Sequence, residues 1–496
     1  MPIRPSHTAL RAVVVVSAAA ATLLGLALTG SSGAPAAPLA NASLQDTTAA
    51  AATATASGGA PIQTGTISGT EKVYVSVVET TPQTSDDVNT GMTESAVQTL
   101  IGRLNSYWSE QSGGKVTIEF SGYETRSLGE STCSPTDALS TEEKSAFGGM
   151  FANDAWRGTH NHLLVLSTES CGAESFATVG GVGGEIFSGN GIGASVGVEY
   201  LLHEFGHNLG FEHADASICT NTSSYDATAA NFTFTSTVCP TREYDDYFDI
   251  MGYTVENATP NLSSPQRIMA GWLTNYATLK ASGGPVTETL TALGGSGGTQ
   301  ALEIIDPNSG DQYYVEYRTD SGLDATSAEF NYALQCDPAM SGYTICELDS
   351  NRSTGDIRVL RFIPFASYGA NGTTVMAIGL TAGSTDKTKR HTHLDAGNSF
   401  TSVDDGFSLS VLSMSPTDGA RVSVTFPTSA VGREPHLVTL PAHMTVTKSA
   451  VTSTTTTTTI EPPVATPTPA TTPAPAPAVA DAAGSMPRGN RWERAV

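Results

Sequence analysis

The sequence predicts an α+β protein made of two parts: a first part that mixes helices with strands, and a second part built as an antiparallel β-sandwich. Segments with the strand period of two and segments with the helical period alternate as far as Trp272 and Leu273. Beyond these residues the helical pattern stops, and short alternating segments recur between clusters of Gly, Asp, Asn and Pro. With 496 residues, the chain is long enough for two domains with tails.

The elements expected in the first part follow from hydrophobic spacing. Val73, Val75 and Val77 alternate as in a half-buried strand. Apolar residues then recur at helical spacing, which predicts a helix through Val97, Leu100, Ile101, Leu104, Tyr107 and Trp108. Thr93 is expected to cap the start of this helix, and the glycines at 113–114 are expected to end it. Period two returns over 116–120, and the apolar run 163–166 suits a buried strand. The predicted order is therefore strand, helix, strand, strand.

The second part is predicted from residues that alternate in several short segments. These residues are Leu302, Ile304, Tyr313, Val315, Tyr317, Ile357, Val359, Val375, Phe407, Leu409, Val411, Val422, Val424 and Phe426. Many short strands separated by such turns favour a sandwich. We expect this domain to support the first part or to bind carbohydrate or protein, and the sequence leaves these alternatives open.

The segment 203–213 carries the residues with the clearest chemistry. His203 and His207 are four residues apart, so on a helix both imidazoles lie on one face and can reach one metal ion. Glu204 lies on the same turn, where a carboxylate can act as general base towards a water at the metal. Gly210 can adopt the left-handed conformation that ends a helix, which allows His213 to return as a third ligand. Three protein nitrogens leave the fourth tetrahedral position to water, as in catalytic zinc sites.

This segment resembles the metzincin signature H-E-x-x-H-x-x-G-x-x-H, and the downstream segment 247–253 resembles the Met-turn of that family. The resemblance implies that Met251 packs beneath the imidazoles without binding the metal. It also places Tyr253 where the astacin and serralysin branches have a tyrosine near the metal, as a fifth ligand or a donor to the oxyanion. Ordinary core packing is the alternative for both residues. With the segment 264–273, the chain looks most like the gametolysin-type secreted metallopeptidases of bacteria, although Ala214 and Asp215 depart from the best-known branches.

The resemblance also implies a catalytic domain with a twisted mixed sheet plus helices, and one catalytic Zn²⁺. A glycine-rich stretch corresponds in the metzincins to the edge strand that pairs with the substrate backbone. Here that stretch is Gly180, Gly181, Val182, Gly183 and Gly184. An open edge can bind an extended peptide by strand addition, and glycines allow another backbone to approach closely. A loop that only connects two elements is the alternative interpretation.

The first residues of the chain predict export. Arg4 and Arg11 precede an apolar run over 12–28 and then a zone of small residues, so 1–42 is predicted to be a cleaved secretory signal peptide. A retained anchor is the alternative. Residues 43–70 have the composition of a low-complexity linker or short prosegment. We therefore expect a secreted protein, extracellular or associated with the cell wall, with no membrane contact after signal removal.

Cysteine usage agrees with export, because the six cysteines are even in number and all follow the predicted signal. Sequence alone permits about 15 pairings of six cysteines. Proximity along the chain favours three disulfides: Cys133 with Cys171, Cys219 with Cys239, and Cys336 with Cys346. A cysteine metal site is the alternative, and the absence of C-x-x-C spacing argues against it.

Charge restricts the partners of the protein. The 48 acidic and 24 basic residues give a formal charge of −24, which is unfavourable for binding nucleic acid or an anionic membrane. A basic cluster nevertheless lies at Lys387, Lys389, Arg390, His391 and His393. It is interpreted as a solvated hairpin, with a weak metal or anion site at the two histidines as the alternative. Ca²⁺ is a second candidate ion near Asp306, Asp311, Asp404 and Asp405.

Together these patterns predict a catalytic domain over 71–280, a β-sandwich domain over 281–430 and a Thr/Pro-rich disordered tail over 431–496. The predicted function is a secreted zinc endopeptidase that hydrolyses peptide bonds of extracellular proteins. A zinc hydrolase acting on wall-linked peptides or another non-protein substrate has the same residues. An inactive surface adhesin of metzincin fold is the non-enzyme alternative, against which the intact Glu204 argues. Contact with the cell wall or with glycans would fall to the second domain or the tail.

Overall fold

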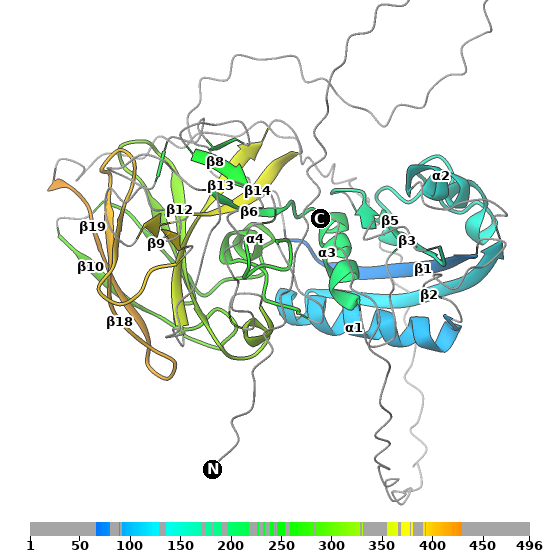
Figure 1. Cartoon of the computed structure of the whole chain (residues 1–496), viewed down its shortest axis with the longest axis horizontal. Coiled ribbons are helices and arrows are strands. Elements are labelled where there is room, and N and C mark those ends of the chain that lie inside the picture. The colour runs from blue at the N-terminus through cyan, green and yellow to red at the C-terminus, as the bar shows by residue number, and fades with distance from the viewer. Residues whose placement is uncertain are drawn as a thin grey trace, which may run out of the picture.

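The computed structural model describes most of the chain between residues 66 and 428. The described residues are 66–79, 89, 92–127, 135–169, 175–180, 182–189, 197–217, 226–227, 232–233, 239–242, 244, 246–252, 258–281, 284–327, 330, 355–365, 369–376, 378–379, 390–391 and 393–428. The predicted signal peptide and tail lie outside them. Within the described part of the chain, no helix is long and apolar enough to cross a bilayer. The fold belongs to the α+β class, as predicted (Figure 1).

The first sheet has five strands in the order β2-β1-β3-β5-β4. Their bounds are β1 Gly69–Glu79, β2 Val116–Ser127, β3 Asn161–Ser167, β4 Ser175–Ala177 and β5 Gly184–Ser188. Neighbouring strands are parallel, except that β4 runs antiparallel to β5. The predicted strand, helix, strand, strand elements are present as β1, α1, β2 and β3, but the order is incomplete, because α2 and a short 3-10 helix lie between β2 and β3.

Helices cover both faces of this sheet, so its inner strands β3 and β5 are buried on both sides. On one face, α1 (Glu94–Ser112) and α3 (Val198–Asn208) pack on Val73, Val75, Leu164 and Leu166. On the other face, α2 (Pro135–Ser145) and the short helix η1 (Ala146–Gly148) share a core with Leu163 and Val165. Successive strand residues therefore point into different cores, and Figure 1 shows α1 below the sheet and α2 above it.

The ends of α1 follow the predicted signals. The Thr93 side chain accepts a hydrogen bond from the Ala96 backbone N–H, at 3.3 Å. At the other end, Gly113 adopts a left-handed conformation with φ of 63°, and its N–H donates to the helix carbonyls. Both caps satisfy backbone groups that a helix end leaves without intrahelical partners.

The second part contains a four-stranded sheet in the order β10-β19-β18-β17 and an eight-stranded sheet in the order β7-β8-β6-β14-β13-β12-β11-β9. The four-stranded sheet consists of β10 Val286–Leu290, β17 Ser399–Thr401, β18 Ser408–Ser415 and β19 Gly419–Thr425. The eight-stranded sheet consists of β6 Ala214–Ser217, β7 Phe232–Thr233, β8 Cys239–Arg242, β9 Tyr276–Leu279, β11 Ala301–Ile305, β12 Gln312–Thr319, β13 Gly355–Phe365 and β14 Gly369–Met376. A two-stranded sheet pairs β15 Ile378–Gly379 with β16 Arg390–His391.

The expectation of purely antiparallel strands is correct for the four-stranded sheet and wrong for the eight-stranded one. In the larger sheet, β9 pairs parallel to β11, β6 pairs parallel to β14 and β7 pairs parallel to β8. The reason is topological, because β6, β7, β8 and β9 come from the chain before residue 280 and extend a sheet formed mainly by later strands. One hydrophobic core includes residues of both sheets, among them Leu302, Val315, Ile357, Leu409 and Val422.

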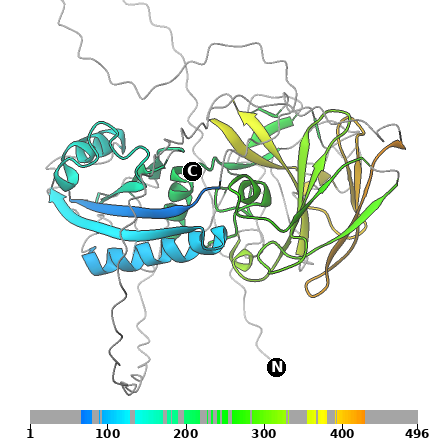
Figure 2. The same ribbon diagram turned by 180° about the vertical axis from the view of Figure 1, so that it is seen from behind.

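The two parts are joined by packing as well as by β6. The short helix α4 (Ser264–Met269) lies between them in both views (Figures 1 and 2). Its Ile268 packs with Tyr314 and Leu360 of the eight-stranded sheet, whereas Met269 belongs to the core of the first part. The strand β6, which directly follows His213, pairs with β14, so the second part of the molecule holds the chain next to this histidine.

Candidate metal centre

The helix α3 presents two of the predicted metal ligands at the boundary of the first core. Its apolar residues Leu201, Leu202 and Phe205 are buried under the five-stranded sheet. His203 and His207 lie four residues apart on this helix, as the spacing predicts. After Leu209, Gly210 takes a φ of 97°, and the chain reverses there. The predicted left-handed conformation of this glycine is confirmed.

The reversal brings His213 to the two histidines of the helix. One ligand atom from each of His203, His207 and His213 lies within 4.8 Å of the others. The ring centroids are 4.8 Å apart for His203 and His207, 4.8 Å for His207 and His213, and 5.5 Å for His203 and His213. This convergence fits one ion bound by three imidazole nitrogens.

Backbone carbonyls fix the tautomer of both helical histidines. The Nδ1 atom of His203 lies 2.9 Å from the Ile250 carbonyl oxygen, and that of His207 lies 2.8 Å from the Phe211 carbonyl oxygen. A carbonyl oxygen can only accept, so each Nδ1 must carry the proton and donate. Each Nε2 therefore keeps a lone pair, which is the state that a metal requires.

Electrostatics favour neutral imidazoles at this site. Burial, together with the nearby His213, lowers the pKa of His203 to about 3. Burial and the other two histidines also lower the pKa of His207 well below its ordinary value. The rings of His203 and His207 are thus uncharged at neutral pH and available to a cation. Burial raises the pKa of Glu204 to about 8, and a bound cation would oppose this shift by favouring the carboxylate.

Met251 lies against the helix between the two histidines. The Met251 side chain is fully buried, and a Cβ added at Gly206 would overlap its Sδ atom. Glycine at position 206 is therefore required for the thioether to approach the helix. The Met251 carbonyl also accepts a hydrogen bond from Ala214, the residue after His213, at 2.9 Å. Met251 thus contacts both chain segments that carry the candidate ligands: the helix with His203 and His207, and the residue after His213.

The turn that carries Met251 is held by a buried carboxylate. Asp249 Oδ1 accepts from the Met251 N–H at 2.8 Å, and its Oδ2 accepts from the Ser263 N–H at 2.7 Å. Gly252 closes the turn, since its N–H donates to the Asp249 carbonyl at 3.0 Å. A Cβ at Gly252 would overlap the Asp246 carbonyl oxygen, so this position also requires glycine.

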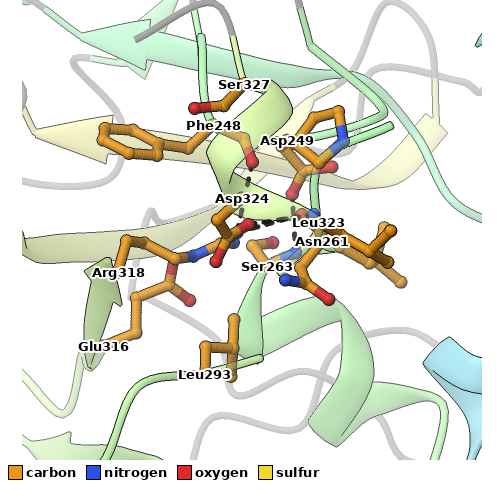
Figure 3. Close-up of polar contacts among 12 residues, drawn as sticks. Phe248, Asp249, Asn261, Ser263, Leu293, Glu316, Arg318, Leu323, Asp324 and Ser327 are labelled. Carbon is orange, nitrogen blue, oxygen red and sulfur yellow. Dashed lines mark hydrogen bonds and ion pairs between the residues drawn. The ribbon is translucent and has the colours of Figure 1, made fainter. Parts of the chain in front are cut away.

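Two arginines of the eight-stranded sheet, Arg318 and Arg358, bind the same turn, and Figure 3 shows the contacts of Arg318. The Arg318 guanidinium donates to the Phe248 carbonyl at 3.2 Å and to Asp324 at 2.6 Å, while its Nε donates to Glu316 at 2.7 Å. Arg358 joins Glu316 at 2.8 Å to Asp246 at 2.5 Å. Although burial favours the neutral acid, Arg318 and Arg358 lower the pKa of Glu316 to about 2. The turn therefore rests on a charged cluster that belongs to the second part of the chain.

Tyr244, which no sequence pattern indicates as a site residue, lies beside the histidines. Its ring centroid is 4.0 Å from that of His213 and 5.8 Å from that of His203. The residue has a φ of 63°, and its N–H donates to Asp215 Oδ1 at 3.1 Å. Tyr244 lies in the connection between His213 and the Met251 turn. The sequence of this connection has no hydrophobic period from which the position of Tyr244 could be predicted. Tyr253, the tyrosine predicted near the metal, lies outside the described residues.

The glycine-rich stretch is not an edge strand. Gly180, Val182 and Gly183 connect β4 to β5, Gly181 lies outside the described residues, and only Gly184 belongs to a strand. That strand, β5, lies inside the sheet between β3 and β4. The physical reason is that Gly180 and Gly183 take φ values of 73° and 90°, which interrupt an extended strand. Of the described strands, β4 is the edge strand next to β5, and β2 is the edge strand on the opposite side of the sheet.

Gly184 has a structural role at the end of the helix. A Cβ at this position would overlap the Asn208 side chain. Asn208 directly follows His207, and its Nδ2 donates to the Thr178 carbonyl at 2.8 Å and to the Glu185 carbonyl at 3.2 Å. The small residue thus allows the C-terminal end of α3 to be tied to the β4–β5 hairpin.

The predicted disulfides are described at one residue only. Cys239, at the start of β8, forms a disulfide. The other cysteines, Cys133, Cys171, Cys219, Cys336 and Cys346, lie outside the described residues, so the pairing stays a prediction.

The four candidate calcium ligands lie on two neighbouring loops. Asp306 and Asp311 flank the turn between β11 and β12, while Asp404 and Asp405 lie in the turn before β18. The loops touch, because Asn308 Nδ2 donates to the Asp404 carbonyl at 2.7 Å. Asp311 forms an ion pair with Arg361, a cation that the protein itself supplies. Binding of Ca²⁺ here stays a prediction.

Comparisons with known proteins add little to this geometry. Neither the family models nor the curated proteins contain a match to the chain. Among solved structures, the chain is similar to one described as the structure of a chaperone–substrate complex, with a TM-score of 0.20 and 18% identity over 29% of this chain. The chain covers 24% of that protein's length. A likeness at this level carries no argument, so the site must be interpreted from its own residues.

Proposed function

We propose that this chain is a secreted zinc-dependent endopeptidase of the metzincin type. One observation carries the proposal: the ligand atoms of His203, His207 and His213 lie within 4.8 Å of one another. The Nδ1 bonds of the two helical rings to carbonyl oxygens support it, because they leave Nε2 free to bind. The donor set fits zinc, since three neutral imidazoles are a ligand set of catalytic zinc sites.

The fold around the site supports the finer assignment. A mixed, mostly parallel sheet with α1 and α3 on one face is consistent with the strand and helix arrangement that the metzincin resemblance implies. The contact of the Met251 side chain with Gly206 of α3 supports the proposal that this turn acts as a Met-turn beneath the metal. We further propose that the two sheets of the second part form a β-sandwich, because they share one hydrophobic core.

The proposed mechanism assigns distinct tasks to the residues of the site. His203, His207 and His213 would hold Zn²⁺, which when bound would polarise the scissile carbonyl and make water more acidic. Glu204 follows the first ligand and lies on the same helical turn. Its carboxylate accepts a proton from the attacking water and delivers that proton to the leaving amine. Met251 holds the helix in place through its contact with Gly206.

Export is proposed together with the activity. The disulfide at Cys239 supports an oxidising compartment, because stable disulfides are rare in the cytosol. The excess of acidic residues, 48 against 24 basic, is consistent with solubility outside the cell and argues against nucleic acid as a partner. The proposed partners are therefore extracellular proteins and peptides, with cell-wall or glycan contact assigned to the second domain or the tail.

A peptide-library digestion tests the activity. The purified chain is incubated with a diverse peptide mixture and, separately, with cell-wall fragments, each with and without a zinc chelator. Mass spectrometry should reveal new peptide termini in the library that disappear with the chelator and return after zinc is added back. Cleavage of wall-linked peptides alone would change the substrate class. Intact peptides in both mixtures, with zinc bound, would contradict the proposal and favour a non-catalytic binding protein.

A further inference from the structure

A second group of metal-ligating side chains lies at the start of β13, in the second part of the chain. It consists of Asp356, His393 and Asp395, and one ligand atom from each lies within 4.8 Å of the others. None of the three belongs to the candidate centre around His203. The basic cluster seen in the sequence contributes only His393 to this group. Asp395 lies two residues after it, and Asp356 comes from the start of β13.

A backbone pairing fixes this arrangement. Ile357 and Leu394 form an antiparallel bridge, in which the Leu394 N–H donates to the Ile357 carbonyl at 2.6 Å. Both side chains are buried in the core between the two sheets. Because neighbouring residues of a strand point to opposite faces, Asp356, His393 and Asp395 share the other face. The ligands are therefore held by backbone geometry on two adjoining chain segments.

The spacing of the ligand atoms fits an ion between them. His393 Nε2 lies 3.8 Å from Asp356 Oδ1, which is too long for a hydrogen bond. Two ligands each about 2.1 Å from a tetrahedral zinc ion are separated by roughly 3.4 Å. The observed separation is close to this value, and a small side-chain adjustment would close the difference. Asp356 is only 3% exposed, so an ion bound to its carboxylate would be largely shielded from solvent.

The neighbouring arginines have other partners. Arg318 lies opposite Asp356 in the β12–β13 register, but its Nε and Nη1 bind Glu316 and Asp324. Arg358 binds Asp246 and Glu316. Both guanidinium groups thus form ion pairs with carboxylates other than Asp356. Two carboxylates and one imidazole are together a donor set that suits a divalent cation.

We propose that Asp356, His393 and Asp395 form a second metal site, which binds a divalent transition cation of the zinc class. An imidazole ligand disfavours Ca²⁺, which prefers oxygen atoms, and the mixed nitrogen and oxygen set suits Zn²⁺. Water completes the coordination. The ion links the start of β13 to the segment 393–395, which comes later in the chain, and so holds these two segments together. Its role is structural, and it is independent of the proposed peptidase activity.

Zinc content of the full-length chain tests this site. After dialysis against a zinc buffer and then metal-free buffer, elemental analysis should find about two zinc ions per wild-type chain. The double variant H393Q/D395N should keep about one ion, and H207A should also keep about one, at a different site. Combining all three substitutions should leave none. The variant D320N is the matched control, because Asp320 is exposed at the end of β12, and it should keep both ions.

Thermal unfolding provides a second measurement. In the H207A background, added zinc should raise the melting temperature, because a ligand that binds only the folded state stabilises it. Adding H393Q/D395N should abolish that rise, and circular dichroism checks that the variant is folded. The site is refuted if H207A retains no zinc and shows no zinc-dependent rise. If H207A instead binds as much zinc as the wild type, the catalytic centre fails and the second site stands.

Discussion

Replacement of Glu204 by glutamine should leave zinc content unchanged and lower kcat/KM for peptide cleavage by about 10²- to 10⁴-fold. Glutamine keeps the size of the side chain and can donate and accept hydrogen bonds, but it cannot accept the proton of the attacking water. The three histidine ligands are not altered, and their carbonyl partners Ile250 and Phe211 are separate from position 204. The effect should therefore appear in turnover and not in metal binding.

The measurement combines elemental analysis with cleavage kinetics on a peptide found in the library digestion. The variant E110Q is the matched control, because it replaces glutamate by glutamine in the same way at an exposed position of α1. Its kinetics should equal those of the wild type. A wild-type rate for E204Q would remove Glu204 from the mechanism, and a loss of zinc in E204Q would assign it to metal binding instead.

Replacement of Arg318 by alanine should destabilise the protein by about 3–5 kcal/mol, the range found when one partner of a buried ion pair is removed. The Arg318 side chain is fully buried, and its loss leaves Glu316 and Asp324 without this cation. It also removes the donor to the Phe248 carbonyl, in the turn that carries Met251 (Figure 3). We therefore expect weaker zinc retention at the first centre together with the loss of stability.

Urea unfolding measures the stability, and zinc retention during dialysis measures the effect on the site. The control is R421A, since Arg421 lies on β19 with an exposed side chain, and surface substitutions usually change stability by less than about 0.5 kcal/mol. An unfolding free energy for R318A within about 1 kcal/mol of the wild type would contradict the stabilising role of the cluster. Weaker zinc retention in R318A would show that the second part of the chain is needed to hold the metal centre.

The features that the sequence predicts well are those set by residues close together in the chain. Thr93 and Gly113 determine the ends of α1 through bonds within one helical turn. The spacing of His203 and His207 and the φ of Gly210 are equally local, so the convergence of three histidines could be expected before the structure. Alternating residues such as Val73 and Leu302 likewise indicate their buried face.

Long-range contacts account for what the sequence does not predict. No local pattern indicates that β6 pairs with β14, or that Arg358 reaches Asp246 across 112 residues. The same is true of Tyr244, whose position beside His213 depends on the fold of a connection without periodicity. Gly180 and Gly183 illustrate the opposite problem, because residues that suit a strand by composition take positive φ values and lie in the connection between β4 and β5.

The proposed function depends on three imidazoles that bind one zinc ion. Crystals of the zinc-loaded chain, measured at energies above and below the zinc absorption edge, reveal whether they do. We expect an anomalous peak about 2.1 Å from one ring nitrogen each of His203, His207 and His213, with both Nδ1 bonds to the Ile250 and Phe211 carbonyls kept. Rings that point apart, or a zinc-loaded crystal with no peak among them, would contradict it.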